Sequence, residues 1–410
     1  MQNTRANIKE IRNTTIAGIA CQFIPIYLLG SIASRLQNVP GYEAIAFLVS
    51  ILSLIIVLLG YGLCWVAADK YAAYKGYKNP LYIYSILNIF GLCILFLKIN
   101  RKTNLKANVE EPLNRFSITS IFASYLVIPL LITPIILIFF FILVGAERYE
   151  EYYQNSQVFS TVSELIMAIA LSWYFFKEFN RAKINFQHIL GSLKKINFKL
   201  PIGLAIIEYL FVCGSYPIVL YSLSFIVPKY VESQLNHEYA TTPISWIFFS
   251  ISALIYAPIM EELFFRGIIF QKIAIKKSFS NGLIISAILF AAIHLRFDII
   301  SLFLMGTISV LLYFKTKQLT TSIIYHFVYN FIVVVRRMHY QLFSNADSSA
   351  QTTIAEFQQH ISDRFEIYIL FLAISTPYLC YFIYKNYPRN YDVQQLPYFA
   401  NQRLADEQNG

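Results

Sequence analysis

The sequence predicts an all-α fold, a polytopic transmembrane helical bundle with about ten spanning helices and one apolar element that does not span. Hydrophobic residues make up 57% of the 410 residues and charged residues only 14%, whereas soluble proteins carry about 25% charged residues. Many apolar runs reach the ~20 residues that a helix needs to cross a bilayer. Because a helix satisfies its own backbone hydrogen bonds in lipid, we expect helices throughout.

The ten predicted spanning helices are 14–35, 44–67, 119–146, 159–177, 202–227, 243–270, 282–295, 299–314, 318–338 and 366–384. The first apolar run, from Thr14 to Ala33, is too long for the hydrophobic region of a cleaved signal peptide and lacks a clear small-residue cleavage site. An eleventh apolar run covers 81–99, and the charges of its flanking loops indicate whether it spans.

Basic loop residues predict the topology, because cytoplasmic loops are enriched in Lys and Arg. The basic segment 5–12 places the N-terminus in the cytoplasm. If 81–99 crossed the membrane, the basic loop 98–115 would lie outside and the acidic loop 147–151 inside, against this bias. We therefore predict that 81–99 does not span and that both termini are cytoplasmic. The loop 336–365, with three arginines offset by acidic residues, is the main exception.

Composition also bounds the function. The net charge of +10 comes from short loops, where it orients the helices, so binding to nucleic acid is not expected. The five cysteines lie in apolar segments without paired spacing, which is typical of buried thiols. The usage of Ile, Asn, Lys and Tyr fits an AT-rich genome and favours a bacterial cell membrane.

The chain is expected to divide into four regions. Residues 1–200 form N-terminal transmembrane helices of unknown role, and 201–340 form a core that contains the polar residues discussed next. A loop and the last transmembrane helix occupy 341–385. The polar tail 386–410 is predicted to be flexible and cytoplasmic.

Three charged residues, Glu261, Glu262 and Arg266, lie inside the predicted span 243–270. An ionised side chain at the centre of a spanning helix costs at least ~2.5–3.5 kcal/mol on insertion scales. Such residues are retained when they pair, face a wet cavity or carry out chemistry. The segment is therefore a candidate functional site.

Polar residues of the following spans lie at a similar depth, at about 1.5 Å of rise per residue. Glu261 lies eleven residues before Lys272, about 16 Å from the inner surface. His294 lies thirteen residues after Asn281, about 20 Å deep, and His326 lies about 14 Å deep. One histidine in a helix is most often a packing residue, but two at matching depth beside a pair of glutamates predict a shared site.

The spacing of the charges predicts their roles. Glu262 and Arg266 are four residues apart, so they share a helix face and can form an ion pair, which is compatible with a structural role. Glu261 points about 100° away. A second carboxylate beside a paired one is suited to act as a general base and later as an acid. Pro258 can loosen the helix just before the pair and admit water.

His326 and Asn330 share a helix face, and both can donate hydrogen bonds to a developing oxyanion. Glu261 and His294 can hold and activate a water molecule. One Glu and two His, namely Glu261, His294 and His326, also match a catalytic zinc set with water in the fourth position, so Zn²⁺ is a candidate cofactor that the sequence does not require.

Two further glutamates, Glu164 and Glu208, also lie in apolar helices. Each lacks a local constellation of polar residues. They can line a cavity, and the favoured interpretation is that each forms a hydrogen bond between helices.

The pattern Glu261-Glu262-x-x-x-Arg266, then Phe290-x-x-x-His294, then His326-x-x-x-Asn330 resembles the three-motif signature of the CPBP family. These are the intramembrane CAAX proteases and bacteriocin-processing enzymes, also called Abi proteins, and they include the type II CAAX prenyl endopeptidases. The resemblance covers roughly 240–335. All three motifs occur in order in successive membrane segments.

This resemblance implies a role for each matched residue. Glu261 and His294 would activate the attacking water, and His326 and Asn330 would stabilise the oxyanion. Glu262 and Arg266 would order the site, with direct participation of Glu262 left open. The family is commonly regarded as metal-dependent, although its site is also described as a glutamate-activated water without a firmly held metal.

The predicted function is that of an intramembrane endopeptidase, of metallo- or glutamate type, which cleaves a membrane-associated or lipid-tethered protein or peptide. CAAX-type and bacteriocin- or pheromone-type processing are both open, and membrane lipid is the expected surrounding partner. The alternative is a non-catalytic membrane immunity or scaffold protein of the same fold. A transporter with a proton relay is disfavoured because the sequence lacks repeated halves.

Overall fold

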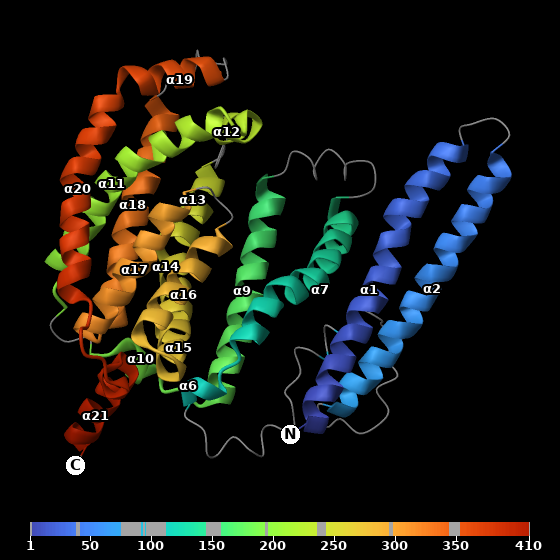
Figure 1. Cartoon of the computed structure of the whole chain (residues 1–410), viewed down its shortest axis with the longest axis horizontal. Coiled ribbons are helices and arrows are strands. Elements are labelled where there is room, and N and C mark those ends of the chain that lie inside the picture. The colour runs from blue at the N-terminus through green and yellow to red at the C-terminus, as the bar shows by residue number, and fades with distance from the viewer. Residues whose placement is uncertain are drawn as a thin grey trace. The chain divides into compact units, whose positions relative to one another are not determined.

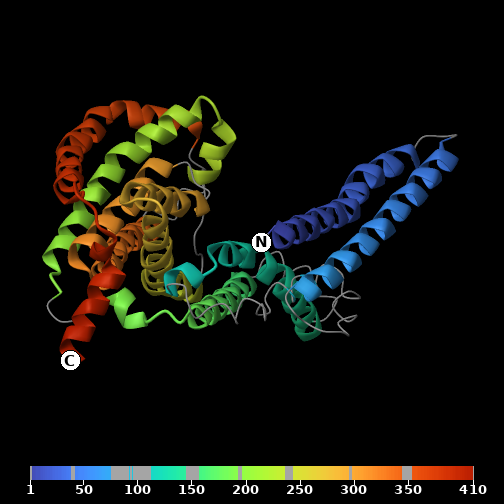
Figure 2. The same cartoon turned by 60° about the horizontal axis from the view of Figure 1, so that its bottom comes forward.

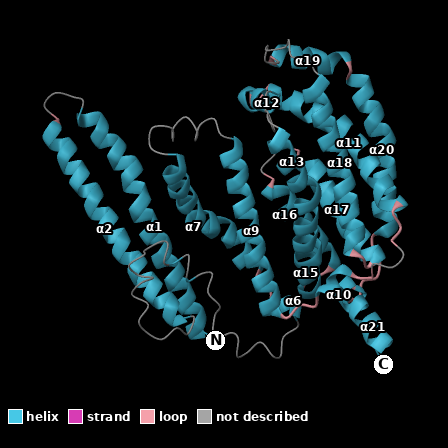
Figure 3. Cartoon of the chain, turned by 180° about the vertical axis from the view of Figure 1, so that it is seen from behind, coloured by secondary structure: helices cyan, strands magenta, loops and turns pink. Residues whose placement is uncertain are grey.

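The computed structural model describes residues 2–37, 42–74, 92, 95, 112–144, 157–192, 196–235, 243–294, 298–343 and 353–409. Helices account for nearly all of these residues, and no strand occurs among them (Figure 3). The predicted all-α class is therefore confirmed. The apolar run 81–99, predicted not to span, lies outside the described residues except for positions 92 and 95.

In the described part of the chain, seven helices are long and apolar enough to cross a membrane: Leu48–Tyr74, Ile118–Phe139, Lys199–Ser224, Ser245–Lys276, Ile299–Thr316, Leu319–His339 and Phe365–Asn386. Two other predicted spans lie within α1 (Gln2–Gln37) and α9 (Gln157–Ala182), and most of the third, 282–293, lies in α16 (Phe279–Ile293). Of these, α16 is apolar but has only 15 residues. The structure thus supports a polytopic membrane protein.

The chain divides into two compact units. The first contains α1, α2 (Glu43–Tyr74), α7 (Ile118–Val144) and most of α9. Its helices α1 and α2 form a long antiparallel hairpin (Figure 2). A Cβ at Gly60 would lie only 2.7 Å from the carbonyl oxygen of Gly18, so the absence of side chains there lets the two helices approach closely.

The second unit contains the whole chain from Lys183 onward and all of the polar motifs. Helix α11 (Lys199–Ser224) packs against α18 (Leu319–Phe343) and α20 (Phe365–Asn386), and α17 (Ile299–Thr316) packs against α16 and α18 (Figure 1). Helix α17 is the most enclosed of these, because 61% of its 18-residue apolar stretch is buried. The polar segments therefore meet around a central helix. The shorter helices are α6 (Pro112–Arg115), α10 (Phe186–Leu190), α12 (Pro228–Leu235) and α19 (Ile354–Asp363).

The span that carries the glutamates is a continuous helix with two π-helical segments. It runs through α13 (Pro243–Ile251), the π-helical segment η1 (Ser252–Tyr256), α14 (Ala257–Glu262), the π-helical segment η2 (Leu263–Phe270) and α15 (Gln271–Lys276). Segments with π-helical hydrogen bonds are rare and occur frequently at functional sites. The first one ends two residues before Pro258, where the sequence predicts a loosened helix.

The C-terminal region differs from the predicted flexible tail. It forms the 3₁₀ turn η3 (Val393–Gln395) and helix α21 (Pro397–Asn409), with Leu396 and Tyr398 buried. The backbone N–H of Tyr398 donates to Gln271 Oε1 at 2.8 Å, and Asn401 Nδ2 donates to the carbonyl oxygens of His188 and Lys317 at 2.9 Å. Burial of apolar side chains and side-chain amide bonds fix this segment against the bundle.

Candidate active site

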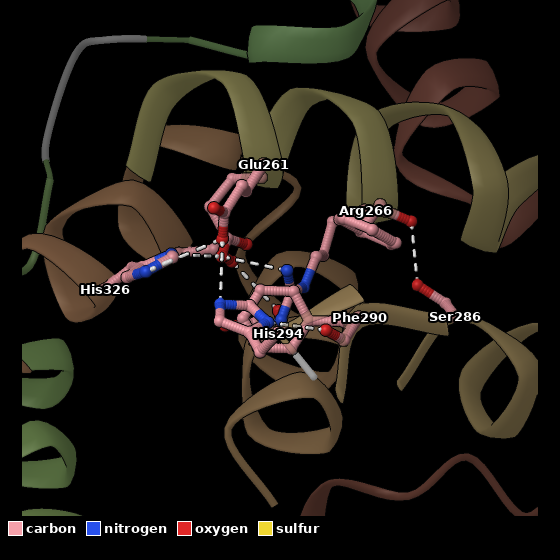
Figure 4. A network of polar contacts seen from close by, with 10 residues as sticks. Glu261, Arg266, Ser286, Phe290, His294 and His326 are labelled. Atoms are coloured by element: carbon pink, nitrogen blue, oxygen red, sulfur yellow. Dashed lines mark hydrogen bonds and ion pairs between the residues drawn. The ribbon is translucent and has the colours of Figure 1, made fainter. Parts of the chain in front are cut away.

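The three polar motifs come together in the second unit (Figure 4). The two glutamates and Arg266 lie on α14 and η2, His294 lies directly after α16, and His326 and Asn330 lie on α18. Ser286 of α16 donates through Oγ to the carbonyl oxygen of Phe265 at 2.9 Å, which fastens α16 to the segment with Arg266. The matching depths estimated from the sequence thus correspond to a real meeting point.

Glu262 and Arg266 form the predicted ion pair. Nη1 of Arg266 lies 3.1 Å from Oε1 of Glu262, and both side chains are fully buried. The guanidinium also lies over the ring of Phe290, 4.3 Å from its centroid. A buried charge pair is costly to desolvate and is strongly destabilised when one partner is lost. The pair is therefore a rigid, enclosed feature beside the more open groups of the site.

Glu261 points away from this pair and toward the two imidazoles. Its Oε2 lies 3.9 Å from Nε2 of His294 and 4.0 Å from Nε2 of His326. The side chains of Glu261 and His294 are 24% and 25% exposed, whereas His326 is nearly buried. One carboxylate oxygen thus faces two ring nitrogens at the accessible side of the cluster.

The other nitrogen of each imidazole determines which tautomer the ring adopts. Nδ1 of His326 lies 3.0 Å from Oε1 of Glu262, and Nδ1 of His294 lies 2.8 Å from the carbonyl oxygen of Phe290. Because carboxylates and carbonyls only accept, both Nδ1 atoms must donate. In a neutral ring the Nε2 atom is then an acceptor.

One acceptor, the Glu261 oxygen, therefore lies about 4 Å from each of two others, the Nε2 atoms of His294 and His326. Acceptors cannot hydrogen-bond to one another, so this geometry suits a group that donates between them, such as a water molecule or an added proton. Oε2 of Glu261 is buried and makes no hydrogen bond within the described residues. The arrangement can bind and deprotonate a water.

Asn330 lies one helical turn beyond His326 and donates through Nδ2 to the carbonyl oxygen of Ala253 at 2.7 Å. In the π-helical register, the N–H of Ala257 donates to the carbonyl oxygen of Ser252. The next residue, Pro258, would donate to the carbonyl oxygen of Ala253 in the same register, but proline has no N–H. Asn330 thus satisfies a carbonyl that Pro258 cannot. One hydrogen of the Asn330 amide is used in this bond, so the predicted oxyanion role would use the second N–H of the same amide.

The predicted zinc ligands approach one another, but their spacing does not fit a closed metal site. In a tetrahedral zinc site with bonds of about 2.1 Å, neighbouring ligand atoms lie about 3.4 Å apart. The Glu261 oxygen lies 3.9 and 4.0 Å from the Nε2 atoms of His294 and His326. Within the described residues, no group of three or more His, Cys, Asp or Glu residues has metal-binding spacing.

The sequence favours an interhelical hydrogen bond for Glu208. Glu208 lies on α11 with 0% exposure, and neither of its carboxylate oxygens makes a hydrogen bond within the described residues, so the structure does not contain the predicted bond. The sequence does indicate the depth of this residue. Glu208 follows Lys199 by nine residues, about 14 Å into the membrane, which is the same offset as that of His326 from Lys317.

Residues 243–332 match the family model for the type II CAAX prenyl endopeptidase Rce1-like proteins. This segment is Rce1-like. The match contains every residue of the three motifs, confirms the resemblance seen in the sequence and supports a CAAX-type intramembrane protease family. No curated protein and no solved structure matches the chain.

The Rce1-like segment begins at α13 and ends within α18. Helix α11 with Glu208 lies before it, and α19, α20 and α21 lie after it. The second unit of the structure is therefore larger than the matched segment and adds side chains of its own around the shared motifs.

Proposed function

We propose that this protein is an intramembrane endopeptidase that hydrolyses a peptide bond of a membrane-associated or lipid-tethered protein or peptide. The observation that carries the proposal is the position of the Glu261 carboxylate, which lies within 4.0 Å of both Nε2 atoms at the accessible side of a buried ion pair. The Rce1-like match supports the same class of reaction.

In the proposed reaction, a water held by Glu261 and His294 attacks the peptide carbonyl carbon. Glu261 accepts the proton of that water as the new C–O bond forms. The negative charge on the carbonyl oxygen is stabilised by His326, protonated at Nε2, and by the second amide N–H of Asn330. Glu261 then transfers its proton to the leaving nitrogen as the C–N bond breaks, without a covalent acyl-enzyme.

The surroundings favour a substrate that reaches the site from the membrane. Glu261 and His294 lie within or at the end of apolar helices, so a peptide anchored in the bilayer is presented at the right depth. CAAX-type processing and bacteriocin- or pheromone-type processing both supply such substrates, and lipid is the surrounding partner. The motif depths support a site at about mid-membrane, reached from the cytoplasmic half, with both termini on that side.

Replacement of Glu261 by Gln tests the proposal, because the amide keeps the shape but cannot act as a base. We expect cleavage of co-expressed membrane-tethered peptides to fall by about 10²-fold or more, as measured by mass spectrometry of the membrane fraction. The matched control is Glu164→Gln, which changes an exposed carboxylate on α9 and should leave cleavage unchanged.

The opposite outcome would identify the alternative function. If the Glu261→Gln variant produces the same peptides as the wild type, the cluster is not a general-base site. A protein that keeps its biological function in that variant would be a non-catalytic membrane immunity or scaffold protein.

A further inference from the structure

The backbone on each side of Arg266 is held by a side chain from elsewhere in the bundle. The carbonyl oxygen of Phe265 accepts from Oγ of Ser286 at 2.9 Å (Figure 4). The carbonyl oxygen of Gly267 accepts from Nε2 of Gln271 at 2.8 Å. Arg266 thus lies between two peptide groups whose oxygens are fixed by side-chain donors.

The amide of Gln271 takes the place of a backbone donor. In an α-helix the backbone N–H of Gln271 would donate to the carbonyl oxygen of Gly267, but at the end of η2 it donates to that of Ile268. The side chain of Gln271, which is fully buried, supplies a donor to Gly267. Because a buried carbonyl without a donor is unfavourable, this amide stabilises the backbone conformation next to Arg266.

The remaining hydrogen-bonding groups of Gln271 connect it to other helices. Its Oε1 accepts from the backbone N–H of Tyr398 of α21 at 2.8 Å, and Nε2 also donates to the hydroxyl of Tyr313 of α17 at 3.2 Å. That hydroxyl donates to the carbonyl oxygen of Ile189 of α10 at 2.7 Å. The oxygen and both hydrogens of one buried amide are therefore used, and they join η2 to α17 and α21.

Helix α10 contacts both α21 and the turn next to Arg266 (Figure 1). On the α21 side, Asn401 Nδ2 donates to the carbonyl oxygen of His188 at 2.9 Å, and the Tyr398 ring packs edge-on against His188 at 5.2 Å between centroids. On the η2 side, a Cβ at Gly267 would lie only 2.9 Å from Cγ2 of Ile189. These contacts close a circuit from α21 through α10 to η2.

We propose that Gln271 is a positioning residue of the site, which couples the docked C-terminal helix α21 to the backbone that presents Arg266. Arg266 pairs with Glu262, and Glu262 accepts the hydrogen bond from Nδ1 of His326. This inference rests on the proposed endopeptidase function. Tyr398, which donates to Gln271, lies outside the Rce1-like segment, so the C-terminal region becomes part of the arrangement that orients the site.

The kinetic test uses Gln271→Leu in the full-length protein, because leucine has a similar volume and no polar group. We expect kcat for a membrane-tethered peptide to fall about 10-fold, since small misplacements of a site cost this much or more. KM should stay within about 2-fold, because the buried Gln271 does not contact the substrate. The matched control is Gln402→Ala, which changes an exposed amide of α21 and should equal the wild type. An unchanged kcat, or a loss that lies in KM alone, overturns the inference.

A milder variant loosens α21 and leaves Gln271 intact. Asn401→Ala removes the amide that donates to the carbonyl oxygens of His188 and Lys317. We expect kcat to fall by a smaller factor than in Gln271→Leu. In the Gln271→Leu background, Asn401→Ala should reduce kcat less than it does in the wild type, because the coupling has already been removed. Equal factors in the two backgrounds overturn the coupling through Gln271.

Hydrogen exchange in detergent needs no cleavage and separates failure of this inference from failure of the proposed function. Asn401→Ala should speed the exchange of backbone amides in both α21 and η2 by about 2- to 10-fold, the range expected for the loss of one hydrogen bond. Exchange in α2 of the first unit should not change. Faster exchange confined to α21 overturns the inference. If α21 and η2 respond together but the wild type cleaves no peptide, the coupling is supported and the proposed function fails.

Discussion

At the scale of single residues, the site separates enclosed charge from accessible chemistry. Glu262 and Arg266 are fully buried and orient His326, whereas Glu261 and His294 are about one quarter exposed. Adjacent glutamates obtain these different environments because they point about 100° apart on a helix. One carboxylate can therefore be structural while its neighbour meets water and substrate.

A residue-scale prediction concerns metal dependence. The separations of 3.9 and 4.0 Å around Glu261 exceed those of a tetrahedral zinc site, so we expect peptide cleavage to persist after treatment with a strong chelator. Metal content of the purified protein should be measured in parallel. Loss of cleavage that zinc alone restores would instead support the zinc set predicted from the sequence.

At the scale of elements, one backbone carbonyl of the helix that carries the glutamates receives its hydrogen bond from a side chain of another helix. Asn330 of α18 donates to the carbonyl oxygen of Ala253 in η1, which Pro258 cannot serve. A buried carbonyl without a donor costs about 1–3 kcal/mol. The π-helical segment and α18 thus stabilise each other's position beside the site.

This interdependence predicts a non-additive pair of mutations. Asn330→Leu should lower the free energy of unfolding by about 1–3 kcal/mol in the wild type. In a Pro258→Ala background the loss should be smaller, because the restored backbone N–H can serve Ala253. Chemical denaturation in detergent measures both effects. An equal loss in the two backgrounds would contradict this account of Asn330.

The loop between α17 and α18 predicts a pH dependence. Lys317 has a left-handed backbone with φ of 59°, its Nζ lies 3.8 Å from the Phe314 ring centroid, and it donates to the carbonyl oxygen of Gln395. Burial, and to a lesser extent the charge of Arg403, lowers the pKa of Lys317 to about 8. The neutral amine is therefore favoured in the folded state.

The sign of the effect follows from proton linkage. Between the folded pKa near 8 and the ordinary pKa of lysine, the unfolded chain binds more protons, so stability rises with pH. We expect the Tm of the wild type, relative to Lys317→Met, to increase between about pH 7 and about pH 9.5. A relative Tm that falls or stays constant over this range would contradict the contact.

At the scale of the whole molecule, membrane topology determines which surface the site faces. Loop charges predict cytoplasmic termini and a non-spanning segment 81–99, and that segment lies largely outside the described residues. The depth of Glu261 below Lys272 is then measured from the cytoplasmic surface. Glu261 is then about 16 Å from that surface, close to the middle of a hydrocarbon core about 30 Å thick.

Labelling at Lys102 tests this topology. In a cysteine-free background, a Lys102→Cys variant should react with a membrane-impermeant thiol reagent only after the cytoplasmic face is opened. The same substitution at Lys277, in the loop between α15 and α16, is a control for the predicted cytoplasmic side. Labelling of Lys102→Cys in intact cells would show that 81–99 spans and would reverse the predicted orientation of the preceding or following helices.

Much of the site is predictable because its information is local. The i, i+4 spacing of Glu262 and Arg266 determines that they share a face, and counting residues from loop lysines gives Glu261, His294 and His326 similar depths. The structure confirms the pairing and the convergence. The catalytic roles assigned to these residues remain predictions until the variants are measured.

Other features depend on partners that are distant in sequence. The sequence indicates the depth of Glu208, but not that its carboxylate is fully buried without a hydrogen-bond partner in the described residues. The docking of the C-terminal region through Tyr398 and Gln271 joins residues 127 positions apart. Pro258 predicts a loosened helix but not that Asn330 supplies the missing donor.

The sequence by itself determined an all-α membrane fold and the three motifs, because lipid forces each spanning segment to satisfy its own backbone and makes every intramembrane charge conspicuous. Only the tertiary structure decided which helix faces meet, that the C-terminal region is packed, and that Asn330 serves the carbonyl of Ala253. The physical reason is that helix pairing in a membrane depends on close packing and polar complementarity between distant segments, which no local pattern encodes.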